Sequence, residues 1–144
     1  MRIAVVDGQG GGIGRAIVER LRAVYQDRIE IVALGTNALA TSAMLKAGAS
    51  EGATGENAIR YNAARVDAIL GPIGIVVANA MLGELTPEIA QAIGECAAPK
   101  FLIPVSRCNV QIAGVENKAL PQFVEETVDW VGTRLHGGNG PVIL

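Results

Sequence analysis

Short hydrophobic runs alternate along the 144-residue chain with longer segments in which hydrophobic side chains recur every three or four positions. The short runs are typical of buried strands, and the longer segments are typical of amphipathic helices. Strands that alternate with helices form parallel sheets whose two faces are covered by helices. The pattern therefore predicts a single three-layer α/β domain over residues 1–144, with a mainly parallel sheet of about five or six strands.

The boundaries of these elements follow from the hydrophobic runs and from residues that start or end helices. Thr54 and Thr86-Pro87-Glu88 are typical helix starts, and Gly48 is a typical helix terminator. The expected strands are residues 2–6, 29–34, 49–54, 73–78 and 101–105, with a short extension at 110–113. The expected helices are residues 13–25, a segment ending near 46, a segment from 54–57 to about 66, residues 87–96 and residues 120–135.

Composition narrows the function more than the fold. Half of the residues are hydrophobic and only 3% are aromatic, which favours strands buried on both faces. The net charge is −2 and no basic stripe is present, so we expect no binding to nucleic acid. The apolar runs are too short for a signal peptide, or for a membrane span of about 20 residues. We therefore expect a cytoplasmic protein that does not associate with membranes.

Cysteine and histidine side chains offer few catalytic candidates. Cys96 and Cys108 are the only cysteines, and because they lack metal-ligand spacing we interpret them as free thiols and expect no metal site. His136 is the only histidine and lies near the end of the last expected helix, where it interacts favourably with the helix dipole. The sequence therefore does not support a histidine-based nucleophilic triad.

The most informative segment is a glycine-rich turn between the first expected strand and the first expected helix. Gly8, Gly10, Gly11, Gly12 and Gly14 are five glycines within seven residues, which exceeds what one tight turn requires. A strand, a glycine turn and a helix place backbone N–H groups and the positive end of a helix beside a phosphate. The segment predicts a phosphate or nucleotide site, and the alternative is a tight turn without a ligand.

The spacing of the glycines excludes two common phosphate-binding motifs. The dinucleotide pattern G-x-G-x-x-G fails from Gly8, because its last position falls on Ile13. The Walker pattern fails because Arg15-Ala16 follows Gly14, where lysine and a hydroxyl residue are needed. The pattern that fits is G-x-x-x-G-x-G on Gly8, Gly12 and Gly14.

With this spacing, residues 2–21 resemble the start of short-chain dehydrogenases/reductases, and the resemblance continues loosely to Val76-Val77-Ala78-Asn79-Ala80. The resemblance implies a Rossmann-like domain that binds NAD(P) or another nucleotide, with Gly8, Gly12 and Gly14 beside the pyrophosphate and Asn79 near the middle of the cleft. The expected cofactor-binding residues are Gly8, Gln9, Gly10, Gly11, Gly12, Ile13, Gly14, Thr36, Asn37 and Asn79.

The chain departs from those enzymes in ways that leave its catalytic residues unassigned. It is much shorter than they are, and it lacks their Tyr-x-x-x-Lys after the fifth strand. The nearest match is Tyr61-x-x-x-Arg65, which precedes the fourth expected strand. Because arginine stays protonated, it cannot relay a proton, and we interpret Tyr61 and Arg65 as a surface pair on one helix face.

The end of the second expected strand also lacks a familiar cofactor signal. Dinucleotide sites usually place an acid there to bind the ribose hydroxyls, whereas this chain has Gly35-Thr36-Asn37. The missing acid disfavours NAD, and the missing arginine disfavours NADP. Thr36 and Asn37 are either neutral ligands of a ribose or phosphate, or a cap of the next helix.

Further candidates follow other strands. Asp7 ends the first strand and has three interpretations: a metal ligand, a ribose ligand, or an acceptor of backbone N–H groups in the glycine turn, which we favour. The segment Thr54-Gly55-Glu56-Asn57 is either a helix cap or a substrate site. Arg107 is a candidate partner of an anionic substrate. The expected substrate-binding residues are Thr54, Glu56, Asn57 and Arg107.

Nearly the whole chain resembles a small bacterial family known as a domain of unknown function, whose members share the Asp-Gly-Gln-Gly-Gly-Gly start and a Thr-Gly-Glu-Asn-Ala segment like residues 54–58. We expect a nucleotide- or dinucleotide-binding homo-oligomer, with a small NAD(P)-dependent oxidoreductase as the first enzymatic interpretation. The alternative is a non-catalytic nucleotide-sensing or regulatory module. A third interpretation is a scaffold whose apolar tail, Pro141–Leu144, docks on another subunit.

Overall fold

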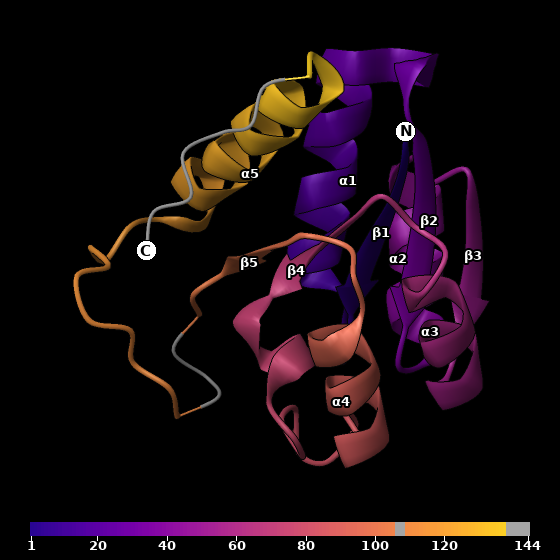
Figure 1. The fold of residues 1–144 in the computed structure, drawn as a ribbon, viewed down its shortest axis with the longest axis vertical. Helices are drawn as coiled ribbons and strands as arrows, with labels where there is room; N and C mark the ends of the chain where they lie inside the picture. Colours follow the sequence, from indigo (N-terminus) through magenta and orange to yellow (C-terminus); the bar gives the residue numbers. More distant parts are fainter. Residues whose placement is uncertain (106–108, 138–144) are drawn as a thin grey trace.

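The computed structural model describes residues 1–105 and 109–137. Five parallel strands form one sheet in the order β3-β2-β1-β4-β5 (Figure 1). This α/β sheet confirms the fold class predicted from the hydrophobic pattern. The strands are β1 (Arg2–Asp7), β2 (Glu30–Gly35), β3 (Glu51–Thr54), β4 (Ala68–Pro72) and β5 (Lys100–Ile103). The helices are α1 (Gly12–Tyr25), α2 (Ala38–Ala47), α3 (Glu56–Ala63), α4 (Pro87–Glu95) and α5 (Leu120–Leu135), with 3-10 helices η1 (Gln26–Arg28) and η2 (Ile73–Val76).

The central strands are hydrophobic between their ends, where helices cover both of their faces. Residues 3–7 of β1 and 31–35 of β2 are all buried. β1 pairs with β2 from Arg2 opposite Glu30 to Asp7 opposite Gly35, so both strands end at the same edge of the sheet. Continuous apolar runs of this kind are what a parallel sheet requires.

Alternate residues of the strands contribute to two separate cores. Ile3 and Val5 pack with α1, α2 and α5, whereas Ala4 and Val6 pack with α3 and α4. Within residues 1–105 and 109–137, three α-helices therefore cover one face of the sheet and two cover the other. The buried Tyr25 hydroxyl at the end of α1 donates to the Val128 carbonyl of α5 at 2.6 Å, which joins the first helix of the chain to the last.

The fourth strand lies earlier in the chain than the hydrophobic pattern predicts. We expected a strand at residues 73–78, but β4 comprises Ala68–Pro72 and is followed by a 3-10 helix. Gly71 lies in this strand opposite Leu102 of β5, and glycine is needed there because a Cβ would overlap the carbonyl oxygen of Val6 on β1. Ile75, the centre of the expected strand, is instead buried in the core beneath α3 and α4.

Other boundaries are partly confirmed. Gly48 ends α2 with a φ of 122°, and Thr86 caps α4 by accepting the Ile89 N–H at 3.1 Å. The expected cap at Thr54 is wrong, because α3 starts one residue later with Gly55 as its N-cap. The expected extension at 110–113 forms no strand among the residues that the structure describes.

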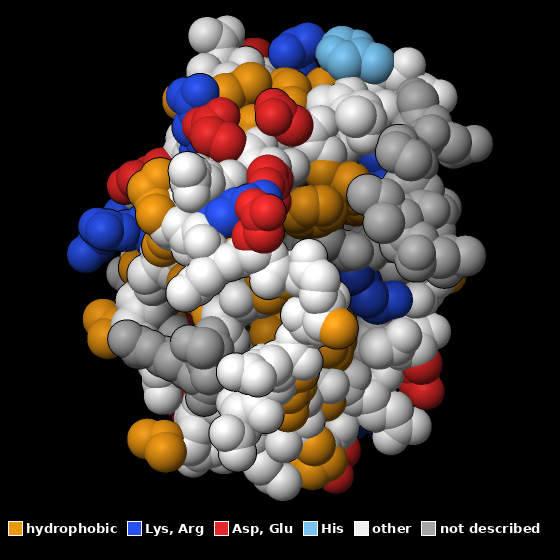
Figure 2. Space-filling model, turned by 90° about the vertical axis from the view of Figure 1, so that its left-hand side faces the viewer, with side chains coloured by type: hydrophobic (Ala, Val, Ile, Leu, Met, Phe, Trp, Pro, Cys, Tyr) orange, Lys and Arg blue, Asp and Glu red, His pale blue; other side chains and the backbone are white. Residues whose placement is uncertain are grey.

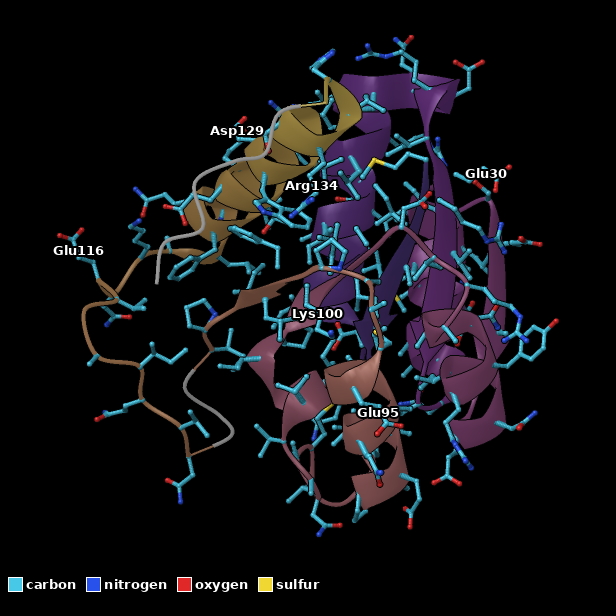
Figure 3. The ribbon with its side chains drawn as sticks, in the orientation of Figure 1. Glu30, Glu95, Lys100, Glu116, Asp129 and Arg134 are labelled. Carbon is cyan, nitrogen blue, oxygen red and sulfur yellow. The ribbon has the colours of Figure 1, made fainter. Side chains whose placement is uncertain are left out.

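The two edges of the sheet differ in chemistry. At the amino edge, Arg2 forms ion pairs with Glu30 at 2.8 Å and with Glu51 at 2.5 Å, and Figure 3 labels Glu30 at the start of β2. At the carboxyl edge, the glycine turn follows β1. Among residues 1–105 and 109–137, no helix is long and apolar enough to span a bilayer.

Candidate functional site

The candidate site lies where the order of the strands reverses. β2 and β3 lie on one side of β1, whereas β4 and β5 lie on the other. The loops after β1 and β4 therefore diverge to opposite faces of the sheet. Open α/β sheets bind ligands at this switch point. The glycine turn is the loop that leaves β1 at this point.

The Asp7 side chain stabilises the glycine turn through hydrogen bonds to its backbone. Its side chain is only 4% exposed, and it accepts the Gly8 N–H at 2.8 Å and the Gly14 N–H at 2.7 Å. One carboxylate thus joins the end of β1 to the first turn of α1, as we favoured from the sequence. Burial raises the pKa of Asp7, although the N–H groups of Gly14, Gly8 and Ile13 oppose this shift by stabilising the charge.

Three glycines allow the turn to pack closely against its neighbours. Gly11, the N-cap of α1, has a φ of 73°, and a Cβ there would lie 2.8 Å from the Ala40 Cα. A Cβ on Gly14 would lie 2.6 Å from the Met44 sulfur, and one on Gly8 would lie 2.5 Å from the Thr36 hydroxyl oxygen. These positions are explained by packing, without a ligand.

Gly10 and Gly12 are different because nothing described lies within 4 Å of a Cβ placed on either residue. Their N–H groups donate to no group within the described part of the chain. Gly12 is the first residue of α1, where backbone N–H groups have no partner inside the helix. The turn therefore combines N–H groups that have no described partner with two exposed glycines.

Glu84, which no sequence motif marks, brings several candidate residues together. A single oxygen, Oε1, accepts the Gln9 N–H at 2.9 Å, the Thr36 hydroxyl at 2.8 Å and the Asn37 side-chain amide at 2.7 Å. Gln9 belongs to the glycine turn, whereas Thr36 and Asn37 follow β2. The predicted cofactor residues at these two strand ends therefore converge on one carboxylate.

These hydrogen bonds also keep Glu84 charged. The Gln9 N–H lowers the pKa of Glu84 most, burial opposes this as the second-largest effect, and the Thr36 and Asn37 side chains lower the pKa further. No spacing pattern could have identified the residue, because Glu84 lies 75 positions from Gln9 and 47 from Asn37. Its only sequence signal is its place in the loop between the fourth strand and α4.

Asn37 has a second role that the sequence allowed. Its side-chain oxygen accepts the Ala40 N–H at 2.9 Å and so caps α2, while its amide nitrogen also donates to the Gln9 carbonyl at 3.0 Å. Asn37 can therefore cap α2 and also present a polar group at the end of β2.

The loop that carries Glu84 has an unusual backbone. Asn79, Met81 and Leu82 have φ values of 65°, 60° and 57°, and Leu82 is 98% exposed. Left-handed conformations are uncommon for such residues. Asn79 was expected at a strand end, but because β4 ends at Pro72 it lies exposed in this loop. Its N–H donates to the Leu85 carbonyl at 2.8 Å.

Two of the expected substrate residues, Thr54 and Glu56, lie at the same edge of the sheet but have internal partners. The hydroxyls of Thr54 and Thr41 lie 2.8 Å apart, and Glu56 accepts the Thr86 hydroxyl at 2.5 Å. Asn57 is exposed in the first turn of α3. Arg107 and Cys108 lie outside the described residues.

The remaining reactive side chains lie on other elements. The Arg65 guanidinium stacks 3.8 Å from the centre of the Tyr61 ring, and Tyr61 is 56% exposed, so the two form the expected surface pair. His136 is exposed at the end of α5, and the Cys96 thiol donates to the Ile93 carbonyl at 3.1 Å. Within the described residues, no group of three or more His, Cys, Asp or Glu side chains is arranged to hold a metal.

Comparisons with known proteins identify a family but no activity. The family model described as "Domain of unknown function (DUF3842)" matches residues 2–136. No curated protein matches the sequence. Among solved structures, a dodecameric FMN-dependent UbiX-like decarboxylase from Escherichia coli O157:H7 is 13% identical, with a TM-score of 0.47 over 96% of this chain and 78% of that chain. A similarity at this level carries no inference about the function of this chain.

Proposed function

The chain belongs to the DUF3842 family, and we propose that it binds a nucleotide at the carboxyl ends of β1, β2 and β4. The observation that carries the proposal is the pair of Gly10 and Gly12, which are exposed and whose N–H groups have no described partner. They lie at the start of α1 and at the switch point of the sheet. Free N–H groups at a helix start favour a phosphate.

The Asp7 carboxylate supports this arrangement without competing for the same donors. It accepts hydrogen bonds from the N–H groups of Gly8 and Gly14, and not from those of Gly10 and Gly12. The conformation of the turn is thus held by the protein itself before any ligand binds. A preorganised donor set costs less ordering entropy when a phosphate arrives.

The reaction class is a separate question, with two candidate answers. A small NAD(P)-dependent oxidoreductase follows from the resemblance of residues 2–21 to short-chain dehydrogenases/reductases. The other candidate is a non-catalytic nucleotide-sensing module. It is favoured because the two carboxylates described at the turn, Asp7 and Glu84, accept hydrogen bonds from the protein itself, which makes them poor candidates for a general acid or base. Turnover separates the two: binding with neither hydride transfer nor hydrolysis supports the sensor.

We also propose that the protein acts as a homo-oligomer. On the face that carries α5, hydrophobic side chains lie between charged ones (Figure 2). Val110, Ile112 and Val115 are exposed in the segment that precedes α5. Light scattering of the purified protein should give a multiple of the chain mass, and a monomeric mass would contradict the proposal. Deleting residues 141–144 tests the predicted docking of the tail.

The nucleotide proposal is tested by calorimetry with NAD(H), NADP(H), ATP, ADP, AMP and flavins. We expect at least one of them to bind wild-type protein, and Gly12→Val to abolish that binding by filling the space beside the N–H groups. The variant should fold, because the added Cβ would have no described neighbour within 4 Å. Gly94→Val on α4 is the matched control, since that position is equally open.

Two results would contradict the proposal. One is an absence of measurable heat with every ligand in the panel. The other is unchanged binding by Gly12→Val, which would move the site away from the glycine turn.

A further inference from the structure

We infer that Glu84 recognises the ribose of the bound nucleotide and selects ligands with a free 2′,3′-diol over those with a 2′-phosphate. The inference rests on the proposed function, because it assigns one part of the same site. It concerns the side chain that joins the glycine turn to the end of β2.

Glu84 is held in one orientation with half of its carboxylate available. Oε1 accepts all three hydrogen bonds, from the Gln9 N–H and from the Thr36 and Asn37 side chains. Oε2 accepts none from any residue in the described part of the chain. The side chain is also partly exposed. An anchored carboxylate with one free oxygen is preorganised to accept hydrogen bonds from a ligand.

The place of this carboxylate matches the chemical need of a ribose. Dinucleotide sites bind the ribose hydroxyls through an acid that follows the second strand. This chain has Thr36 and Asn37 at that point, and both side chains donate to Glu84. No acid follows β2 in the sequence, but Glu84 from the loop after β4 lies beside the end of β2 in the folded chain.

The charge of Glu84 determines which ribose fits. Its hydrogen bonds lower its pKa, so the side chain accepts hydrogen bonds and does not donate them. A vicinal diol donates O–H groups and complements this carboxylate. A 2′-phosphate is an anion that offers no comparable donors at neutral pH, so it is repelled.

A competing interpretation is that Glu84 occupies the place of a ligand phosphate and must leave before a nucleotide binds. The glycine turn disfavours this interpretation, because the N–H groups of Gly10 and Gly12 remain free while Glu84 keeps its three donors. Phosphate and carboxylate therefore have separate donors. The two interpretations predict opposite effects of removing the carboxylate.

The test compares wild-type protein with Glu84→Gln and Glu84→Ala by calorimetry, using NAD⁺ against NADP⁺ and ATP against 2′-deoxy-ATP. We expect wild type to bind the diol-bearing member of each pair about tenfold more tightly or better, the scale of a hydrogen bond to a charged group. Glu84→Gln should lose about tenfold in affinity for NAD⁺ and reduce its preference over NADP⁺. Glu88→Gln, an exposed acid on α4, should behave as wild type.

Each other outcome has a defined meaning. If wild type binds none of the four nucleotides, this inference fails, and the proposed function fails with it only if ADP, AMP and flavins also give no heat. If it binds them without preference, or if Glu84→Gln leaves the preference intact, only this inference fails. Tighter binding by Glu84→Ala would overturn it in favour of the competing interpretation. Thermal unfolding of each variant shows whether a loss of affinity reflects a loss of fold.

Discussion

Two carboxylates at the carboxyl edge of the sheet have opposite surroundings and different roles. Asp7 is buried and binds backbone N–H groups within its own turn, whereas Glu84 is partly exposed and joins two loops. The role of Asp7 could be predicted because its partners lie within seven positions in the sequence. The role of Glu84 could not, because it depends on how the loop after β4 folds over the turn.

Asp7→Asn should destabilise the protein by about 1–3 kcal/mol, the cost of leaving a buried donor without its acceptor. An amide has one oxygen, so it cannot accept both the Gly8 and Gly14 N–H groups as the carboxylate does with its two oxygens. Urea unfolding at neutral pH measures the change. Asp27→Asn, an exposed acid in η1, is the matched control, and equal stability of the two variants would refute the role of Asp7.

The contribution of Glu84 to stability should depend on pH in a defined direction. Its pKa is lowered in the folded protein, so its stabilising effect is present above the unfolded value of about 4.3 and is lost as pH falls through the folded value. Wild type should therefore exceed Glu84→Gln in free energy of unfolding by a constant amount near neutral pH. The difference should shrink below about pH 4.3. A difference that grows on acidification in urea titrations would contradict the assigned hydrogen bonds.

At the scale of elements, hydrophobic patterning predicts most of the fold, and close backbone packing accounts for the main error. β1, β2 and α5 lie where the pattern places them. β4 lies elsewhere. In the sequence, Gly71 and Pro72 look like the end of an element, because the close contact between Gly71 and the Val6 carbonyl is not visible there. The same limit applies at Gly11, whose left-handed backbone is needed where α1 starts beside α2. Each of these contacts joins two elements that are far apart in the sequence, so a pattern within one segment does not predict it.

Gly11→Ala should therefore destabilise the protein by at least about 2 kcal/mol, from the left-handed backbone together with overpacking. The added Cβ would lie 2.8 Å from the Ala40 Cα. Gly10→Ala, one residue earlier and open, should leave stability unchanged or slightly higher. Denaturant unfolding of the two variants measures the contrast, and equal losses would show that the whole turn, and not its packing against α2, is sensitive to substitution.

At the scale of the whole molecule, the parallel sheet places the loops after β1, β2 and β4 at one edge. The glycine turn, the polar end of β2 and the loop with Glu84 meet there although they are far apart in the sequence. A site of this kind is built by topology. The sequence predicts that the site lies at the carboxyl ends of the strands and includes the glycine turn. The position of Glu84 beside that turn depends on the fold.

A nucleotide that binds the folded chain should also stabilise it. At a ligand concentration 100 times the Kd, the expected gain is about 2.7 kcal/mol. For a domain of this size, the gain corresponds to a rise in Tm of roughly 5–10 °C. Thermal unfolding with and without the best ligand measures the shift. Gly12→Val should lose it, whereas Gly94→Val should keep it, and equal shifts in both variants would contradict binding at the turn.

The most direct test of the central claim is a titration of ¹⁵N-labelled protein with that nucleotide, followed by amide NMR. If phosphate binds the free N–H groups of the turn, the largest chemical-shift changes should fall on Gly10 and Gly12, with smaller changes at Gln9. Amides on the outer face of α5 should not move. Saturable binding with the largest changes outside residues 8–14, or no changes with any nucleotide of the panel, would contradict the account.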